Sequence, residues 1–335
     1  MLALIQKHAG FSGGMEGPHI DDAAEYIALA TLPIPVPAKD QVLIKLRAAS
    51  VNPSDLHFIK GEYGQPRVKG AVAGFEGCGD VVSAGAGAKG LIGKRVAFVA
   101  ANAGAWAEYV VADTLTCIPL RPDISDEDGA AQIVNPLTAM AMVDIAAKAS
   151  DSFVISAATS QLGKLMIGLA KNKGLNAIAL VRRENAVEPL LNMGAAAVIV
   201  TTANSFRDDF EATSRKYKPR VFLDAVCDQT SETVFTLMPN RARWVCYGKL
   251  SRVAPVLTQM GQFTFMGKQI EGFWLTNWMR NTPPSDQKQA IGEVQARFAD
   301  GRWKTDVSAR LSLNEVVDGL ADALKLPDGK VMITP

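Results

Sequence analysis

Ser152-Phe-Val-Ile-Ser-Ala-Ala-Thr-Ser-Gln-Leu-Gly163 decides the fold, because it predicts a short buried strand, a turn and the start of a helix. That helix is predicted to continue to Asn172, and further strands are predicted over Asn176–Val181 and Ala197–Val200. Strands over 220–224 and 243–247 continue the alternation of helix and strand. This order predicts an α/β domain with a doubly wound parallel sheet and right-handed crossovers.

The first third of the chain has a different texture, with short alternating runs and many turn residues. Residues 41–46 predict a strand, and three glycine-dense stretches follow between Gly61 and Gly93. At the other end, residues 314–324 predict a helix and residues 330–333 predict a terminal strand. The first third is therefore expected to be rich in β-strands and loops.

Charge and composition exclude several kinds of partner. The 335 residues include 35 basic and 34 acidic side chains, and a net charge of +1 gives no field for binding nucleic acid or anionic lipid. Apolar residues make up 48% of the chain, as in folded proteins, and the longest apolar runs are too short to span a bilayer. The expected partner is a small-molecule substrate.

The four cysteines and three histidines are scattered, with no Cys-x-x-Cys motif and no cysteine–histidine pair at zinc-ligand spacing. No metal site is therefore expected. The even number of cysteines leaves disulfides open. Four cysteines in a chain of this length, without a secretory or presequence pattern, are more typical of reduced thiols, and we expect a cytoplasmic protein.

The turn after the first predicted strand of the parallel sheet is a candidate dinucleotide site. Such turns bring a pyrophosphate to a helix N-terminus. Against the pattern Gly-x-Gly-x-x-Gly, the turn has Ala158, Ser160 and Gly163, so only the third glycine, which allows close helix–strand packing, is present. The predicted cofactor-binding residues here are Thr159, Ser160, Gln161, Leu162 and Gly163. The alternative is an ordinary loop that binds no phosphate.

The next strand indicates which dinucleotide binds. A cofactor with free ribose hydroxyls is normally held by an acid at the end of the second strand. This strand instead ends with Arg182 and Arg183, whose guanidinium groups suit a 2′-phosphate. The sequence therefore predicts NADPH as the cofactor. The alternative is a solvated pair of arginines at a helix start.

More specific patterns occur in five stretches: Val51-Asn-Pro-Ser-Asp55, Gly74-Phe-Glu-Gly-Cys-Gly-Asp-Val-Val82, Asn135-Pro-Leu-Thr-Ala139, residues 157–163, and Gly329-Lys330-Val331. Together they resemble the zinc-independent medium-chain dehydrogenase/reductases, which are quinone oxidoreductase-like. The resemblance implies a GroES-like catalytic domain of residues 1–120 and 297–335 and a Rossmann domain of residues 121–296. It also implies a homodimer formed through edge strands of the two cofactor domains.

The same resemblance bears on zinc. Zinc-dependent relatives place a cysteine near Asn52–Asp55 and a histidine at the position of Phe75, and neither ligand is present here. The resemblance therefore implies chemistry without a zinc Lewis acid.

A second set of stretches consists of Ile59-Lys-Gly-Glu-Tyr-Gly64, Ala101-Asn-Ala-Gly104, Asn135-Pro-Leu-Thr138 and Glu271-Gly-Phe-Trp-Leu-Thr-Asn-Trp278. It resembles the mitochondrial-type 2-enoyl-thioester reductases. In that family a tyrosine matching Tyr63 protonates the substrate carbon, and residues matching Phe273, Trp274 and Leu275 line the nicotinamide pocket. A glycine that the family has in the phosphate turn is Gln161 here.

Tyr63 is the candidate catalytic acid. Hydride addition to the β-carbon of an α,β-unsaturated carbonyl leaves an enolate. A phenol with an ordinary pKa near ~10 is protonated at neutral pH and able to donate to that enolate. The alternative is a tyrosine that only fills a glycine-rich loop.

The resemblance places further cofactor contacts at Asn52, Asn135, Thr138 and Lys330. For the asparagines and the threonine, the alternative is helix capping and turn formation. For Lys330, the alternative is a solvated side chain near a terminus.

Aromatic residues occur at two further places in the cofactor-binding part of the sequence. Tyr247 and Gly248 follow a predicted parallel strand and are expected at the ligand edge of the sheet, where the glycine allows close approach of a cofactor. Trp274 and Trp278 are four residues apart, which suits one helical face. They are core or dimer contacts, walls of an apolar substrate pocket, or both.

Three functions remain open from the sequence. The leading one is an NADPH-dependent reductase of an activated C=C bond, in a 2-enoyl thioester or an enone. The second is an NADPH:quinone oxidoreductase, in which water protonates the reduced oxygens and Tyr63 is dispensable. The third is a catalytically idle NADPH-binding protein, which the irregular phosphate turn makes conceivable.

Overall fold

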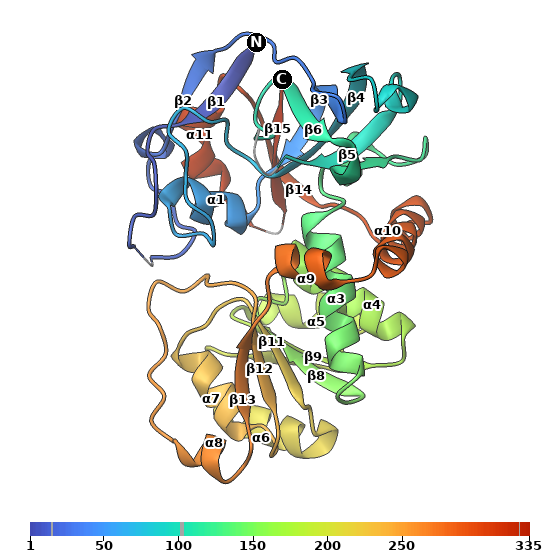
Figure 1. The fold of residues 1–335 in the computed structure, drawn as a ribbon. Helices are drawn as coiled ribbons and strands as arrows, with labels where there is room; N and C mark the ends of the chain where they lie inside the picture. Colours follow the sequence, from blue (N-terminus) through green and yellow to red (C-terminus); the bar gives the residue numbers. More distant parts are fainter. Residues whose placement is uncertain (15, 101–103, 328) are drawn as a thin grey trace. The chain divides into compact units, whose positions relative to one another are not determined.

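The computed structural model describes residues 1–14, 16–100, 104–327 and 329–335, which form two compact units (Figure 1). The first unit contains residues 1–134 and 292–335, and the second contains residues 135–291. The stretch 101–104 named above lies outside the described residues, apart from Gly104. In the described part of the chain, no helix is both long enough and apolar enough to cross a membrane.

The second unit is built on a six-stranded parallel sheet with the order β10-β9-β8-β11-β12-β13. The strands are β8 (Ser152–Ile155), β9 (Asn176–Val181), β10 (Ala197–Val200), β11 (Val221–Asp224), β12 (Arg243–Cys246) and β13 (Gln269–Gly272). The first strand, β8, lies inside the sheet, and the chain winds first to one side of it and then to the other. This order confirms the predicted doubly wound sheet, and the strand order reverses between β8 and β11.

The helices that connect these strands are α4 (Gln161–Asn172), α5 (Val187–Met193), α6 (Phe206–Tyr217), α7 (Gln229–Leu237) and α8 (Gly261–Thr264). Helix α3 (Val134–Ala147) precedes β8, and α9 (Leu275–Asn281) and α10 (Pro284–Ala299) follow β13, with α10 continuing into the first unit. On one side of the sheet, the Trp244 ring lies 6.0 Å from the Phe222 ring and 5.4 Å from the Phe235 ring, between centroids. These buried aromatic contacts fix α7 against the sheet.

The first unit is rich in β-strands and combines both ends of the chain. A small sheet pairs β1 (Leu2–Gln6) with β2 (Ile27–Thr31), and the large sheet has the order β14-β15-β3-β4-β5-β7, with β6 also paired to β3. Its strands are β3 (Gln41–Ser50), β4 (Glu76–Ala84), β5 (Arg95–Val99), β6 (Tyr109–Asp113), β7 (Cys117–Pro119), β14 (Val307–Ser312) and β15 (Lys330–Thr334). The terminal strand β15 pairs antiparallel with β3, which joins the C-terminus to the first third of the chain.

Three helices complete the first unit: α1 (Pro53–Lys60), α2 (Asp126–Ala130) and α11 (Val316–Ala323). Helix α1 starts at a capping box, because the Asp55 carboxylate accepts a hydrogen bond from the Asn52 backbone amide. It ends at Gly61, whose φ of +79° is in the left-handed region that favours glycine.

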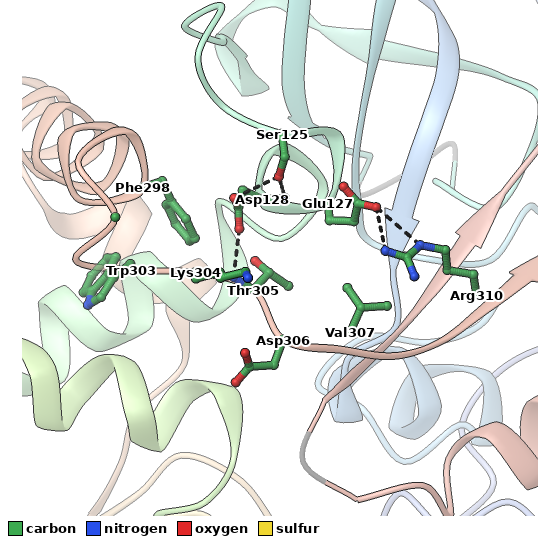
Figure 2. Close-up of a pocket in the computed structure, with 11 residues that line it drawn as sticks. Ser125, Glu127, Asp128, Phe298, Trp303, Lys304, Thr305, Asp306, Val307 and Arg310 are labelled. Carbon is green, nitrogen blue, oxygen red and sulfur yellow. Dashed lines mark hydrogen bonds and ion pairs between the residues drawn. The ribbon is translucent and has the colours of Figure 1, made fainter. Parts of the chain in front are cut away.

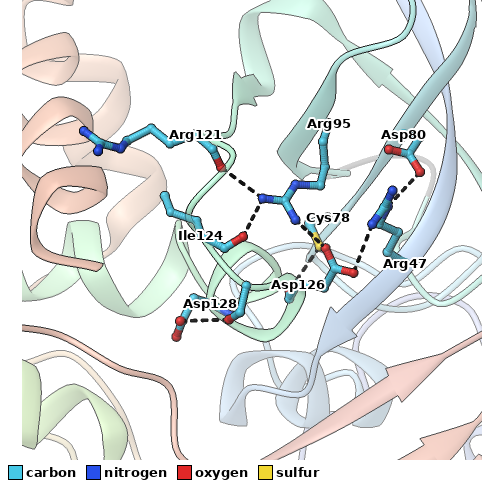
Figure 3. A network of polar contacts seen from close by, with 9 residues as sticks. Arg47, Cys78, Asp80, Arg95, Arg121, Ile124, Asp126 and Asp128 are labelled. Atoms are coloured by element: carbon cyan, nitrogen blue, oxygen red, sulfur yellow. Dashed lines mark hydrogen bonds and ion pairs between the residues drawn. The ribbon is translucent and has the colours of Figure 1, made fainter. Parts of the chain in front are cut away.

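The boundary of the first unit differs from the expected position after residue 120, because α2 is anchored on its sheet (Figure 3). The Asp126 carboxylate pairs with Arg95 at 2.8 Å and with Arg47 at 3.3 Å. Arg95 also donates to the carbonyls of Arg121 and Ile124, and the Cys78 thiol lies 3.1 Å from the Asp126 carbonyl. These contacts hold residues 121–130 to β3, β4 and β5, so the division falls after Val134.

Candidate functional site

The turn between β8 and α4 lies at the carboxyl edge of the parallel sheet. Ser160 caps α4, with its hydroxyl accepting a hydrogen bond from the Gly163 amide at 3.1 Å. Ala157 has a φ of +46°, a conformation that L-residues rarely adopt and that is often found at ligand sites. Helix α4 has twelve residues, so its N-terminus presents the positive end of a substantial helix dipole at this turn.

Gly163 is required by packing. A Cβ atom at this position would lie 2.5 Å from the Ala158 carbonyl oxygen, and Ala158 is itself fully buried. The glycine therefore lets the first turn of α4 lie directly against the Ala158 backbone of the turn. Ala158 stands at the position of the pattern's first glycine, and its methyl group is fully buried in the turn.

The end of β9 presents two cations at the same sheet edge. Arg182 and Arg183 are both exposed, and they follow directly after Val181, the last residue of β9. The anion-favouring helix terminus and these two guanidinium groups both suit a phosphorylated dinucleotide. The residues of this edge therefore fit the predicted cofactor.

Asp224 ends β11 at the same edge and was not predicted as a site residue. Its carboxylate accepts hydrogen bonds from the Ser156 hydroxyl at 2.5 Å and from the Trp244 indole at 2.8 Å. It also accepts from the backbone amides of Val226 at 2.9 Å and Cys227 at 3.1 Å. Asp224 thus fixes the loop after β11 to β8 and β12. An acid directly after three buried apolar residues was the available signal, but an ordinary surface aspartate has the same local pattern.

Tyr247 and Gly248 follow β12, as predicted. The Tyr247 hydroxyl is buried without a hydrogen-bond partner among the described residues, and burial together with the Asp224 charge raises its pKa. A Cβ atom at Gly248 would lie 3.2 Å from the Ala225 carbonyl oxygen, so the glycine allows neighbouring loops to approach closely. The orphaned hydroxyl is a second feature of this edge that suits a polar ligand.

The other predicted residues of the second unit lie on α3 and after β13. Asn135 and Thr138 are in the first turns of α3, where Thr138 is buried. Phe273 follows β13, and Trp274 has extended backbone angles as the N-cap of α9, which starts at Leu275. The predicted placement of Trp274 and Trp278 on one helical face is therefore wrong, because the helix begins after Trp274.

Tyr63 belongs to the first unit and follows α1. Its ring packs edge-on against Phe58, with centroids 6.2 Å apart, and against Phe75 at 5.1 Å. Phe58 and Phe75 also contact each other, at 5.1 Å between centroids. Phe75 stands at the position where zinc-dependent relatives place a histidine. Its ring therefore packs against Tyr63, the candidate acid.

Asn52 and Lys330 meet in a buried network of the first unit. The Lys330 ammonium donates to the Asn52 side-chain oxygen at 2.5 Å and lies 3.4 Å from the Val51 carbonyl. The Asn52 side-chain amide donates to the Glu76 carboxylate at 2.8 Å and to the Ser50 hydroxyl at 3.1 Å. Lys330 is 6% exposed, which rules out the solvated alternative. Burial lowers its pKa, against the opposing effect of Glu76 and Asp55.

Glu76 and Asp55 are the acids of this network, and neither was assigned a role from the sequence. The second Glu76 oxygen accepts hydrogen bonds from the backbone amides of Ile133 at 3.1 Å and Val134 at 2.9 Å. Asp55 accepts a hydrogen bond from the Asn52 backbone amide at 2.7 Å, and its other carboxylate oxygen has no partner among the described residues. Burial, reinforced by the Glu76 charge, raises the pKa of Asp55 to about 7.

A separate pocket of about 690 Å³ lies between α2 and the chain from Phe298 to Arg310 (Figure 2). Asp128 accepts a hydrogen bond from the Thr305 amide at 2.8 Å, and Glu127 pairs with Arg310 at 2.9 Å. None of the predicted site residues lines it.

Across the described ranges, no group of three or more histidine, cysteine or acidic side chains is arranged to hold a metal ion.

Comparison with known proteins defines the class. Residues 38–122 match the family model described as alcohol dehydrogenase GroES-like domain, and residues 162–295 match the model described as zinc-binding dehydrogenase. Together with the fold and its dinucleotide edge, these matches define a two-domain oxidoreductase. A mitochondrial enoyl-[acyl-carrier-protein] reductase of Bos taurus is 30% identical over 281 residues, which cover 82% of this chain and 75% of that protein.

The crystal structure of a candidate NADPH:quinone reductase from Mesorhizobium loti is 46% identical to this chain, with a TM-score of 0.95 and coverage of 100% of this chain and 98% of that one. A candidate NADPH:quinone reductase from Bacillus thuringiensis shares the fold, at 24% identity and a TM-score of 0.87, over 100% of this chain and 99% of that one. The chain belongs to the medium-chain dehydrogenase/reductase family, in its zinc-independent, quinone oxidoreductase-like branch.

Proposed function

We propose that this protein is an NADPH-dependent reductase that transfers hydride to the activated C=C bond of a 2-enoyl thioester or an enone. The observation that carries the proposal is Tyr63, whose ring is packed against Phe58 and Phe75. An acid supported in this way is what enolate protonation requires, and a simple electron transfer to a quinone does not require it. The relationship to the enoyl reductase of Bos taurus supports the same chemistry.

The cofactor, NADPH, supplies the hydride when bound. In the second unit, the residues from Thr159 to Gly163 at the start of α4 would hold its pyrophosphate, and Arg182 and Arg183 would hold its 2′-phosphate. Further proposed contacts with the cofactor are Asn135, Thr138, Tyr247, Gly248, Phe273, Trp274 and Leu275 from the second unit, and Asn52 and Lys330 from the first.

Tyr63 donates a proton to the α-carbon, or a hydrogen bond to the carbonyl oxygen, as negative charge develops after hydride transfer. A positioned acid of this kind contributes about 10²–10⁴-fold to the rate. The packing of its ring against two phenylalanines limits the rotamers available to it, so the hydroxyl is oriented before the substrate binds.

The second candidate is an NADPH:quinone oxidoreductase. It is favoured by the similarity to the Mesorhizobium loti protein, which is 46% identical and is described as a candidate quinone reductase. In that reaction water protonates the reduced oxygens, and Tyr63 serves only to shape the surroundings of the substrate.

A substrate panel tests the proposal. NADPH oxidation is followed at 340 nm with a 2-enoyl thioester such as crotonyl-CoA, with a simple enone and with a benzoquinone, and kcat/KM is compared. We expect the highest kcat/KM with the enoyl thioester or the enone. Turnover confined to the quinone would overturn the proposal and favour the second candidate, and no turnover with any acceptor would favour a binding protein.

We also propose that the protein is a homodimer in the cytoplasm. Strand β13 is at the edge of the parallel sheet, and Ile270 on that strand and the nearby Phe265 and Met260 are exposed apolar side chains. Pairing of β13 with a second copy would satisfy the edge and cover these residues. Free thiols at all four cysteines support a reducing compartment. Sedimentation equilibrium tests the dimer, and a monomer at micromolar concentration would contradict it.

A further inference from the structure

Two of the four cysteines lie together at the carboxyl edge of the parallel sheet. Cys246 is the last residue of β12, and Cys227 is in the loop that follows the neighbouring strand β11. The register of the two strands places Asp224 opposite Cys246. Cys227 is three residues after Asp224 and lies near the end of β12. The Cys227 thiol lies 3.3 Å from the carbonyl oxygen of Gly248, two residues beyond Cys246, and the Cys246 side chain is its neighbour.

The position of Cys227 is fixed by its backbone. Its φ of +56° is in the left-handed region, which non-glycine residues rarely adopt. Its amide donates to the buried Asp224 carboxylate at 3.1 Å, which holds this conformation in place. The side chain is thereby held toward the end of β12, where its thiol contacts the Gly248 carbonyl.

The other two cysteines provide an internal contrast. Cys78 and Cys117 belong to the first unit, and both are buried. Burial raises the pKa of each thiol to about 12, so neither forms the reactive thiolate at neutral pH. Cys227 and Cys246 are both partly exposed, which gives a small oxidant access to the pair.

We propose that Cys227 and Cys246 are a redox site that forms a reversible intramolecular disulfide with a hydroperoxide as the oxidant. The Cys246 thiolate attacks the peroxide, which breaks the O–O bond, gives a sulfenic acid and releases an alcohol or water. The Cys227 thiol then attacks the sulfenic sulfur, the S–S bond forms, and the two hydrogens leave with the hydroxyl oxygen as water. Two external thiols reverse the reaction by exchange.

The order of attack follows from the pair's own contacts. The interaction with the Cys246 side chain, burial and the nearby Asp224 charge all raise the pKa of Cys227, so this thiol keeps its proton at neutral pH. We therefore assign Cys227 as the thiol that resolves a sulfenic acid at Cys246 before it is oxidised further.

The disulfide also changes the sheet edge beside the predicted cofactor residues. In the reduced protein the Cys227 sulfur contacts the Gly248 carbonyl, and disulfide formation removes this contact and ties the loop after β11 to the end of β12. This step rests on the proposed function, in which Tyr247 and Gly248 border NADPH. We expect the oxidised protein to bind NADPH about tenfold more weakly than the reduced protein.

Peptide mapping tests the disulfide without any activity measurement. The full chain is treated with hydrogen peroxide, remaining thiols are alkylated under denaturing conditions, and the digest is analysed by mass spectrometry before and after reduction. We expect a peptide that links Cys227 to Cys246, abolished by dithiothreitol, with Cys78 and Cys117 alkylated as free thiols. Separate alkylation or separate sulfinic acids at Cys227 and Cys246 would overturn the proposal.

Matched variants separate the possible outcomes. Cys117→Ser should retain the cross-linked peptide, whereas Cys227→Ser should lose it and accumulate sulfenic or sulfinic acid at Cys246. NADPH binding by the reduced and oxidised protein is then compared by fluorescence titration. A disulfide with unchanged NADPH affinity would overturn the link to the cofactor edge. A reduced protein that binds no NADPH would instead overturn the proposed function, and the mapping result would still decide the disulfide.

Discussion

Each unit buries an aspartate completely, but the two carboxylates are stabilised in different ways. Asp224 of the second unit accepts hydrogen bonds from four donors, which are a hydroxyl, an indole and two backbone amides. Asp55 of the first unit accepts one from the Asn52 amide, and its second oxygen has no partner among the described residues. The surroundings of Asp55 are charged, with Lys330 and Glu76 as its electrostatic neighbours.

The difference indicates how each unit tolerates a buried acid. Neutral donors around Asp224 are contributed by adjacent strands and loops, so the charge is solvated by the fold itself. In the first unit a single ammonium group, Lys330, faces two carboxyl groups, and the pKa of Asp55 rises. The Asp224 carboxylate should therefore depend on several neutral donors, while the acids of the first unit depend on one cation.

The largest effect is expected from removing that cation. Lys330→Met leaves Glu76 without its neighbouring positive charge in a buried position, which typically costs about 3–5 kcal/mol of folding stability. Urea unfolding measured by circular dichroism checks this. Lys325→Met, which changes an exposed lysine paired with Asp322, is the matched control and should cost far less than Lys330→Met, because water already screens that pair. Equal costs for the two variants would show that the buried network is not a source of stability.

Asp55 should give the first unit a pH-dependent stability. Its ordinary pKa is 3.8 and its pKa in the folded protein is about 7, so between these values the native state holds a proton that the unfolded chain has released. The free energy of unfolding therefore falls with rising pH across this window, by at most about 1.4 kcal/mol per pH unit, and levels off above it.

Asp55→Asn removes this contribution and retains an oxygen that accepts the Asn52 amide. Urea unfolding at pH 5, 6, 7 and 8 should show a smaller decrease for the variant than for the unmodified protein. Parallel curves for the two proteins would mean that Asp55 is ionised throughout the range and that Lys330 compensates it fully.

A smaller loss is expected at Asp224. Asp224→Asn replaces an acceptor oxygen with a donor, which leaves at least one of the amides of Val226 and Cys227 or the Trp244 indole unpaired, at about 1–3 kcal/mol. Thermal and urea unfolding measure the cost, with the exposed Asp151→Asn as control. A loss no larger than that of the control would show that the four donors do not stabilise the Asp224 carboxylate.

The smallest change in stability is expected at the cationic edge of the second unit, where the effect falls on the cofactor. Replacing Arg182 and Arg183 with alanine should leave folding intact, because both side chains are exposed. NADPH affinity should fall about ten- to a hundredfold, while NADH affinity changes little, since only NADPH carries the 2′-phosphate. Calorimetric titration of both cofactors measures this, with Arg207→Ala on α6 as control. Equal losses for both cofactors would contradict a 2′-phosphate contact.

The parallel sheet was predictable because each strand–helix unit is contiguous in the sequence and carries its own apolar pattern. The same holds for Gly163, whose packing role depends on the nearby Ala158. Lys330 and Asn52 are 278 residues apart, and no local pattern indicates that they share a hydrogen bond. Asp224 was missed for a similar reason, since its four donors come from three separate segments. Trp274 was misplaced because spacing alone does not show where a helix begins.

The role of Tyr63 as a proton donor is tested most directly by Tyr63→Phe, which keeps the ring packing on Phe58 and Phe75 and removes only the hydroxyl. Its kcat is measured with a 2-enoyl thioester and with a benzoquinone, using NADPH and its 4-deuterated form to establish that hydride transfer limits the rate. We predict that kcat with the thioester falls by about 10²–10⁴-fold, while the quinone rate and NADPH affinity stay nearly unchanged. An unchanged thioester rate, with a full isotope effect, would contradict the acid role of Tyr63.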